Sequence, residues 1–89
     1  MSDRAERQAT DLLTLARLPA GRQARVVAVV GTGTIARRLM EMGVVPGAPV
    51  RVIKAAPFGD PLEVRVRGYH LALRRAEAET IMVAADGAG

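Results

Sequence analysis

Short apolar stretches separated by turn residues run through this chain, and most of them show the two-residue period of β-strands. Residues 62–67 alternate strictly, with Leu62, Val64 and Val66 on one side and charged residues on the other. After Gly68 the apolar positions move from even to odd numbers, which predicts a turn there and a strand hairpinned to the preceding one. The five predicted strands cover residues 24–30, 50–55, 62–67, 69–73 and 80–83.

Two of these strands depart from simple alternation. Residues 24–30 are apolar on both faces, so we expect both faces of this strand to be covered. Val52 and Ile53 are adjacent apolar residues, which predicts either a β-bulge or burial on both faces in the second strand. Five short strands with tight turns favour a small, partly open five-stranded barrel, because closure removes unpaired strand edges. The predicted fold class is all-β with one short helix.

That helix is predicted over residues 34–42, with Thr34 as its N-cap. Ile35, Leu39 and Met42 recur at helical spacing and form the inward stripe, and Met40 is assigned to the core or its edge. The residues predicted on the opposite side of the helix are Arg37, Arg38 and Glu41. Gly43 stands where a left-handed residue closes a helix, so that Val44 packs back on Leu39.

Turn residues divide the rest of the chain. Leu15 and Leu18 are spaced to place one short turn on the core, and residues 45–48 have the Pro-Gly order of a type II turn. A short, polar and helical turn is expected over residues 74–79. The expected organisation is a flexible N-terminal leader at 1–11, one barrel domain at 12–84 and a C-terminal tail at 85–89.

Composition excludes several classes of chemistry. The 89 residues contain no cysteine, one histidine and one serine, so disulfide scaffolds, thiolate metal sites and serine triads are excluded. No nucleophile–base pair and no carboxylate dyad emerges, and we expect no enzyme, no catalytic residue and no cofactor. No apolar stretch has the length of a membrane helix or signal core, so a cytoplasmic protein is expected.

The formal net charge is +4, and the cations gather in the middle of the chain. A basic small barrel is a candidate for nucleic-acid binding, because affinity for nucleic acids comes largely from phosphate contacts. Phe58 and Tyr69 are the only aromatic residues, however, and single-strand binders stack bases on aromatic side chains. The charge therefore has two interpretations, a solvated arginine-rich surface and a nucleic-acid-binding face, and the first is favoured.

Three further features have ordinary explanations beside chemical ones. Gly31 and Gly33 could cradle a phosphate before the helix, but two glycines at such a junction usually supply positive φ angles. His70 alone does not make a metal site, and we expect it to point to solvent. Phe58 lies between two prolines, where it either anchors a protein partner or folds back over the open end of the barrel.

Four segments taken together resemble the FeoA family. TLARLPAG resembles the family opening TLxxLxPG, and RRLMEMGVVPG resembles its helix and turn RRLxxMGLxPG. AAPFGDPLEVRVRGY resembles xAPxGDPxxxxVxGY, and LALRRAEA resembles LSLRxxEA. The departures are Ala72 where serine is common, Phe58 where an aliphatic residue is common, and ten extra residues at the start.

This resemblance implies an SH3-like barrel and a cytosolic accessory protein of bacterial ferrous iron uptake. The implied partner is the FeoB permease, which carries a cytosolic GTP-binding domain. The resemblance transfers no catalytic or metal-ligating residue. A basic nucleic-acid-binding protein and an iron-responsive regulatory domain remain alternatives, and self-association stays open. The residues expected to contact a partner are Arg37, Arg38, Glu41, Phe58 and Tyr69.

Overall fold

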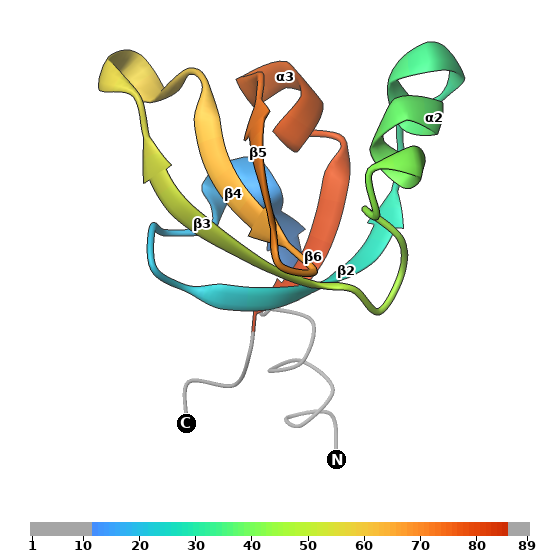
Figure 1. Cartoon of the computed structure of the whole chain (residues 1–89), viewed down its shortest axis with the longest axis horizontal. Coiled ribbons are helices and arrows are strands. Elements are labelled where there is room, and N and C mark those ends of the chain that lie inside the picture. The colour runs from blue at the N-terminus through green and yellow to red at the C-terminus, as the bar shows by residue number, and fades with distance from the viewer. Residues whose placement is uncertain (1–11, 86–89) are drawn as a thin grey trace.

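Six antiparallel strands form one strongly bent sheet in the computed structural model, which describes residues 12–85 (Figure 1). The strands are β1 (Leu12–Thr14), β2 (Gln23–Val29), β3 (Pro49–Ala55), β4 (Leu62–Val66), β5 (Tyr69–Leu73) and β6 (Ile81–Ala85). The helices are α2 (Gly33–Glu41) and α3 (Arg75–Ala78), with 3₁₀ turns η1 (Leu15–Arg17) and η2 (Pro57–Gly59). The five predicted strands and the helix are confirmed.

The sheet has one more strand than predicted and does not close. Its order is β1-β6-β2-β3-β4-β5, so β1 and β5 are its two edges. The added strand is β1, in which Leu12 lies opposite Ala84 of β6. The expected leader at 1–11 lies outside the described residues, and Ala85, the first residue of the expected tail, is the last residue of β6. No helix within residues 12–85 is long and apolar enough to span a membrane.

The concave face of the sheet holds the hydrophobic core. Alternation on β4 places Leu62, Val64 and Val66 inside, as predicted. Leu15 and Leu18 from the η1 turn are buried against the same core, which confirms that prediction too. Burial of these aliphatic side chains is the main stabilising term, at roughly 25 cal/mol per Å² of apolar surface removed from water.

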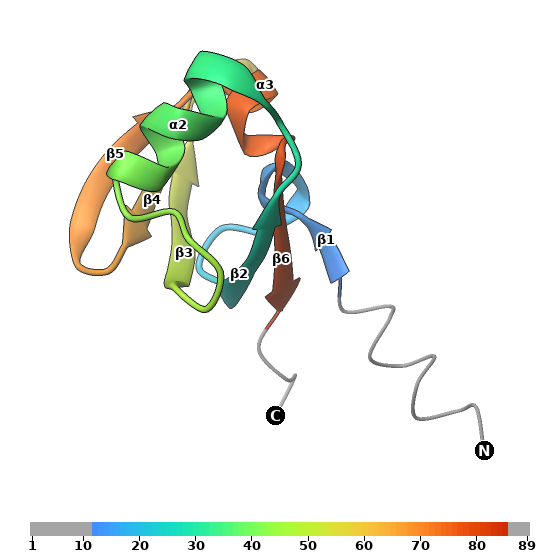
Figure 2. The same cartoon turned by 90° about the vertical axis from the view of Figure 1, so that its right-hand side faces the viewer.

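The prediction that both faces of the first strand are covered is wrong. Ala24 and Val26 are buried, but Val27 is exposed. The pairing of β2 with β6 shifts register between Val26 and Ala28, and no other element within residues 12–85 lies over the outer face of β2. Only some of the apolar residues of β2 therefore pack in the core. Figure 2 shows the outer side of β2 facing away from the rest of the fold.

Three local predictions about turns and bulges are confirmed. Register shifts between Val52 and Lys54 in the β3–β4 pairing, so Ile53 occupies a bulge. The Ala48 N–H donates to the Val45 carbonyl at 3.0 Å, with a left-handed Gly47 between them, as in a type II turn. Arg67 and Gly68 both have positive φ, which is the type I′ geometry of a two-residue hairpin.

Helix α2 confirms the predicted closure and corrects the predicted beginning. The Val44 N–H donates to the Leu39 carbonyl at 2.9 Å across a left-handed Gly43, which is the Schellman arrangement. The helix begins at Gly33 after Thr32, so Thr34 is not its N-cap. Leu39 is the buried residue of α2, whereas Ile35 is 43% exposed, so the predicted inward stripe is wrong at Ile35.

Candidate functional site

Helices α2 and α3 and the turn η2 lie at the same end of the molecule (Figures 1 and 2). In Figure 1 this is the upper end, with η2 on the left, α3 in the middle and α2 on the right. We call the surface formed by α2, α3 and residues 57–60 the end surface. It carries four of the five residues expected to contact a partner: Arg37, Arg38, Glu41 and Phe58.

Helix α3 is bonded to both of its neighbours on the end surface. The Arg38 Nη1 atom of α2 lies 3.9 Å from the Glu77 Oε2 atom of α3. On the other side, the Arg75 N–H donates to the Asp60 Oδ1 atom at 3.2 Å. Glu77 also accepts a hydrogen bond from the Arg74 N–H at 2.9 Å. The ion pair thus joins α2 to α3 on one side, and the hydrogen bond joins the η2 turn to α3 on the other.

Glu77 is the residue of α3 whose loss we expect to matter most for stability. Its side chain is mostly buried, it caps the start of α3, and it faces Arg38. Glu77→Ala is expected to lower the free energy of unfolding by about 1 kcal/mol, because the Arg74 N–H loses its acceptor. Glu79→Ala is the matched control, because its ion pair with Arg75 is exposed and is expected to contribute at most about 0.5 kcal/mol. Urea titration of both variants measures the difference, and equal losses would contradict it.

Phe58 projects fully into solvent. Its backbone has φ 72° and ψ 7°, the left-handed region that a residue with a side chain seldom adopts. The Gly59 N–H donates to the Ala56 carbonyl at 2.7 Å and closes the turn beneath it. The structure therefore excludes the interpretation in which this ring folds back over the barrel. A large apolar ring held on a fixed turn is the kind of residue that anchors a protein interface.

The outer side of α2 is hollowed and partly apolar. A shallow depression of about 510 Å³ is lined by Gly33, Ala36, Arg37, Met40 and Glu41. Met40 is 55% exposed, so its assignment to the core or its edge is wrong, whereas Met42 packs against the core as expected. An apolar floor bordered by Arg37 and Glu41 has the chemistry of a protein-contact surface.

Tyr69 is the expected contact residue that the structure sets apart from the others. It is exposed and is the first residue of β5. Strand β5 runs toward α3, so its first residue lies at the end of the strand away from the end surface. The structure therefore places Tyr69 beside the β4–β5 turn, with Arg67 and Gly68.

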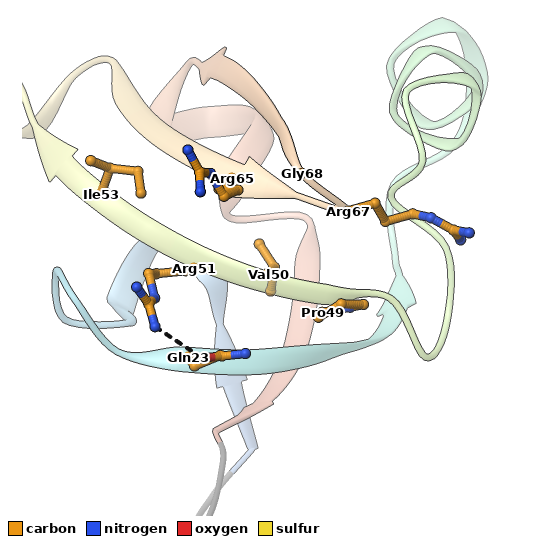
Figure 3. Close-up of a pocket in the computed structure, with 8 residues that line it drawn as sticks. All are labelled: Gln23, Pro49, Val50, Arg51, Ile53, Arg65, Arg67 and Gly68. Carbon is orange, nitrogen blue, oxygen red and sulfur yellow. Dashed lines mark hydrogen bonds between the residues drawn. The ribbon is translucent and has the colours of Figure 1, made fainter.

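A second hollow lies on the outer face of the sheet, over β2, β3 and β4 (Figure 3). Its volume is about 300 Å³, and its lining residues are Gln23, Pro49, Val50, Arg51, Ile53, Arg65, Arg67 and Gly68. Arg51 donates to the Gln23 Oε1 atom at 3.0 Å. Arg65 is one of the charged residues that alternate with the apolar ones along 62–67, and the β3–β4 register brings Arg51 opposite it.

The weaker chemical candidates find no support in the arrangement. His70 is exposed, as expected. Within residues 12–85, no group of three histidine or acidic side chains could hold a metal ion. Gly33 has φ +76° at the start of α2, which is the ordinary structural use of a glycine at a strand–helix junction. The expected positive φ is wrong for Gly31.

The FeoA domain family matches residues 13–85, which cover the whole described sheet apart from Leu12. The chain belongs to the FeoA family. A relative from Porphyromonas gingivalis (strain W83) is an Fe(2+) transport protein A/Fe(2+) transporter FeoB fusion protein. It is 39% identical over 71 residues, which cover 80% of this chain and 8% of the fusion protein. The chain therefore spans a small part of that relative's length.

Solved FeoA structures share this fold. The FeoA protein of Chlorobium tepidum is 42% identical, with a TM-score of 0.81 over 86% of this chain and 73% of its own. The Stenotrophomonas maltophilia FeoA, described as a prokaryotic SH3 domain protein complexed with zinc, is 40% identical. Its TM-score is 0.73 over 80% of this chain and 88% of its own. The expected SH3-like fold is thus confirmed, as a loose and open barrel of six strands. The family is associated with ferrous iron transport.

Proposed function

We propose that this FeoA protein is a cytosolic accessory protein of ferrous iron uptake that binds the cytosolic part of a FeoB-type permease. The observation that carries the proposal is the fusion relative, in which a segment 39% identical to this chain belongs to the same polypeptide as FeoB. Fusion gives two interacting partners a high effective concentration, which is useful where they work together. The protein acts by contact and performs no reaction of its own.

The end surface is the proposed site of contact. Phe58 offers an exposed ring on a fixed turn, and α2 offers an apolar depression bordered by Arg37 and Glu41. Aromatic and arginine side chains contribute more to interface energies than most residue types do. Arg38 is partly engaged with Glu77, so it adds positive charge beside the depression and helps to hold α2 against α3. Tyr69 lies outside this surface and belongs to the proposed contact only if the permease also covers the β4–β5 turn.

Binding to the cytosolic part of the permease from the same genome tests this proposal. Calorimetric titration, with and without GTP, is carried out for the wild type, Phe58→Ala and Arg37→Glu. Each substitution is expected to weaken binding at least tenfold, because truncating an interface anchor typically costs about 2 kcal/mol or more. Both side chains are exposed, so the melting temperature is expected to stay within about 2 °C of wild type.

Arg17→Glu is the matched control for charge, because Arg17 is an exposed arginine on η1. It changes the net charge as Arg37→Glu does and is expected to leave binding unchanged. Wild-type affinity in both test variants would remove the end surface from the proposal. No binding by the wild-type protein, with or without GTP, would overturn the proposed partner itself.

A further inference from the structure

Strand β5 is an edge strand whose outer side has no partner among the described residues. It pairs with β4 alone, and the type I′ turn makes Val66 and Tyr69 a hydrogen-bonded pair. Hydrogen-bonded pairs alternate along an antiparallel ladder, so the N–H and carbonyl groups of His70 and Ala72 point away from β4. No residue in 12–85 bonds to them from the outer side, and in Figure 2 β5 forms the left margin of the molecule. These main-chain groups are therefore available to another strand.

This edge also lacks the features that usually keep strands from pairing with other chains. Natural edge strands are shielded by lysine, proline or a bulge. The sequence of β5 is Tyr-His-Leu-Ala-Leu, and its register with β4 is continuous. The other edge, β1, is three residues long and offers much less backbone. Strand β5 is therefore the edge at which a further strand finds the most main chain to pair with.

The outer face of the sheet beside this edge carries opposite charges at two neighbouring positions. His70 lies opposite Arg65 of β4, and Ala72 lies opposite Glu63. On its other side, the Glu63 Oε2 atom is 3.9 Å from the Lys54 Nζ atom, in an exposed pair that contributes little. Because the Glu63 side chain is 47% exposed and the intervening Ala72 is small, its carboxylate is accessible from the edge. The edge is therefore positive beside His70 and negative beside Ala72.

This order of charges is complementary to itself about a two-fold axis. Two copies of one strand paired about such an axis run antiparallel, and each copy offers the same residues to the other. With Leu71 at the axis, His70 of each copy lies opposite Ala72 of the other, so all of their outward main-chain groups pair. Glu63 of each copy is then two strands away from His70 of the other, roughly 10 Å between Cα atoms. The two side chains span this distance over the small side chain of Ala72.

The charges distinguish this register from two others that also pair outward main-chain groups. With His70 at the axis, the His70 and Arg65 side chains of both copies lie side by side. With Ala72 at the axis, the Glu63 carboxylates of both copies face each other. Like charges facing each other across neighbouring strands destabilise a sheet. Of the three registers, the one with Leu71 at the axis places Glu63 beside cationic residues and pairs every outward group of β5.

The face of β5 that points toward the core is apolar and incompletely covered. Tyr69 is 69% exposed, and Leu71 is only partly buried. With Leu71 at the axis, the Leu71 side chains of the two copies form a non-hydrogen-bonded pair, in which side chains approach most closely. Tyr69 of each copy lies opposite Leu73 of the other. A single strand pair is a small interface, and interfaces below about 1,200 Å² are typical of weak, transient association.

We propose that the free edge of β5 binds a second copy of this chain, forming a weak two-fold dimer in which the two sheets are continuous. The β5 strands pair antiparallel with Leu71 at the axis, and Glu63 of each copy faces His70 and Arg65 of the other. Strand addition takes its affinity from main-chain hydrogen bonds and its specificity from alternate side chains. The inference does not rest on the proposed permease contact.

Self-association of the full chain is measured over an about hundredfold range of concentration, because mass action makes a weak dimer concentration-dependent. In sedimentation velocity, the apparent mass is expected to rise from that of a monomer toward that of a dimer. In NMR spectra of the ¹⁵N-labelled chain, the amide signals of His70 and Ala72 are expected to shift with concentration. Their hydrogen exchange is expected to slow at least threefold at the highest concentration, because these N–H groups become bonded only in the dimer.

Two charge substitutions test the register. Glu63→Arg and Arg65→Glu each place like charges on facing positions of the dimer, so each variant alone is expected to self-associate at least tenfold more weakly than wild type. An equimolar mixture of the two variants has opposite charges at both pairs of facing positions. This mixture is expected to associate at least as tightly as wild type.

Arg37→Glu on α2 is the matched control for charge. Alone, it is expected to self-associate as wild type does. Mixed with Glu63→Arg, it supplies the same net charge as Arg65→Glu but leaves cations facing each other on one side of the axis. This mixture is expected to associate more weakly than the mixture of Glu63→Arg with Arg65→Glu.

Ala72→Pro tests main-chain pairing. It removes an outward N–H without breaking a bond to β4 and is expected to abolish both the mass increase and the exchange protection of His70. The rescue by mixing the two charge variants does not require the proline variant to fold.

A monomer at every concentration, without shifts at His70 and Ala72, would overturn the proposal. Failure of the charge-variant mixture to associate would overturn the register with Leu71 at the axis. Undiminished self-association of a folded Ala72→Pro variant would place the contact away from β5 and overturn strand addition. A monomeric protein that binds the permease normally would reject this inference alone, and a dimer that does not bind the permease would reject the proposed function alone.

Discussion

Leu39→Ala is expected to lower the free energy of unfolding by about 2–5 kcal/mol, the range for a leucine truncated inside a packed core. Leu39 is 0% exposed and is the residue through which α2 enters the core. It also accepts the Val44 hydrogen bond that closes the helix, so a cavity beneath it disturbs both packing and the chain exit. Urea unfolding followed by circular dichroism measures the loss, with a fall in melting temperature of at least about 10 °C.

Ile35→Ala on the same helix is the control. It removes as many carbon atoms as Leu39→Ala does. Because the Ile35 side chain is 43% exposed, the expected loss in the free energy of unfolding is below about 1 kcal/mol. The two substitutions together distinguish the predicted stripe from the observed one. A loss at Ile35 as large as that at Leu39 would show that both residues face the core in solution.

Val64→Asp is expected to prevent folding at 25 °C. Val64 is 0% exposed and lies between Val52 on β3 and Leu71 on β5, with apolar neighbours on both strands. An unpaired buried carboxylate costs several kcal/mol, which is comparable to the whole stability of a domain of this size. Loss of amide signal dispersion in the NMR spectrum and an increased hydrodynamic radius would confirm the expectation.

Arg65→Asp, one residue further along β4, is expected to stay folded. Arg65 points outward and lies opposite Arg51, so the substitution replaces a repulsive cross-strand pair with an attractive one. The change in unfolding free energy is expected to remain within about 0.5 kcal/mol. Unfolding of this variant, or folding of Val64→Asp, would contradict the register assigned to β4.

Local patterns in the sequence were sufficient for most of the fold. The alternation at 62–67 predicted which side of β4 is buried, and the phase change after Gly68 predicted the hairpin. The adjacent Val52 and Ile53 predicted a bulge or burial on both faces, and the register shift shows that the bulge is the alternative realised. Each of these signals depends on residues within a few positions of one another, where backbone geometry and side-chain direction are tightly linked.

The predictions that were wrong depend on contacts between distant segments. Strand β1 is three residues long, too short for a pattern, and it exists because β6 lies beside it. Ile35 has helical spacing with Leu39, but Leu39 is the buried residue of α2, and how a helix packs against a sheet depends on segments outside the helix. The alignment of Arg51 with Arg65 and His70 requires the registers of three strands, which no local pattern supplies.

The pairing of β6 with β1 and β2 bears on how the chain folds during its synthesis. The meander of β3, β4 and β5 uses contacts between neighbouring strands, so it can assemble as soon as residues 49–73 have left the ribosome. Strand β2 can pair with β3 at that stage, but its other edge needs β6, and β1 pairs with β6 alone, so both pairings require residues 81–85. Until then the apolar residues of β2 lack the neighbouring strand β6, and β6, which follows the other described strands in the sequence, completes the sheet.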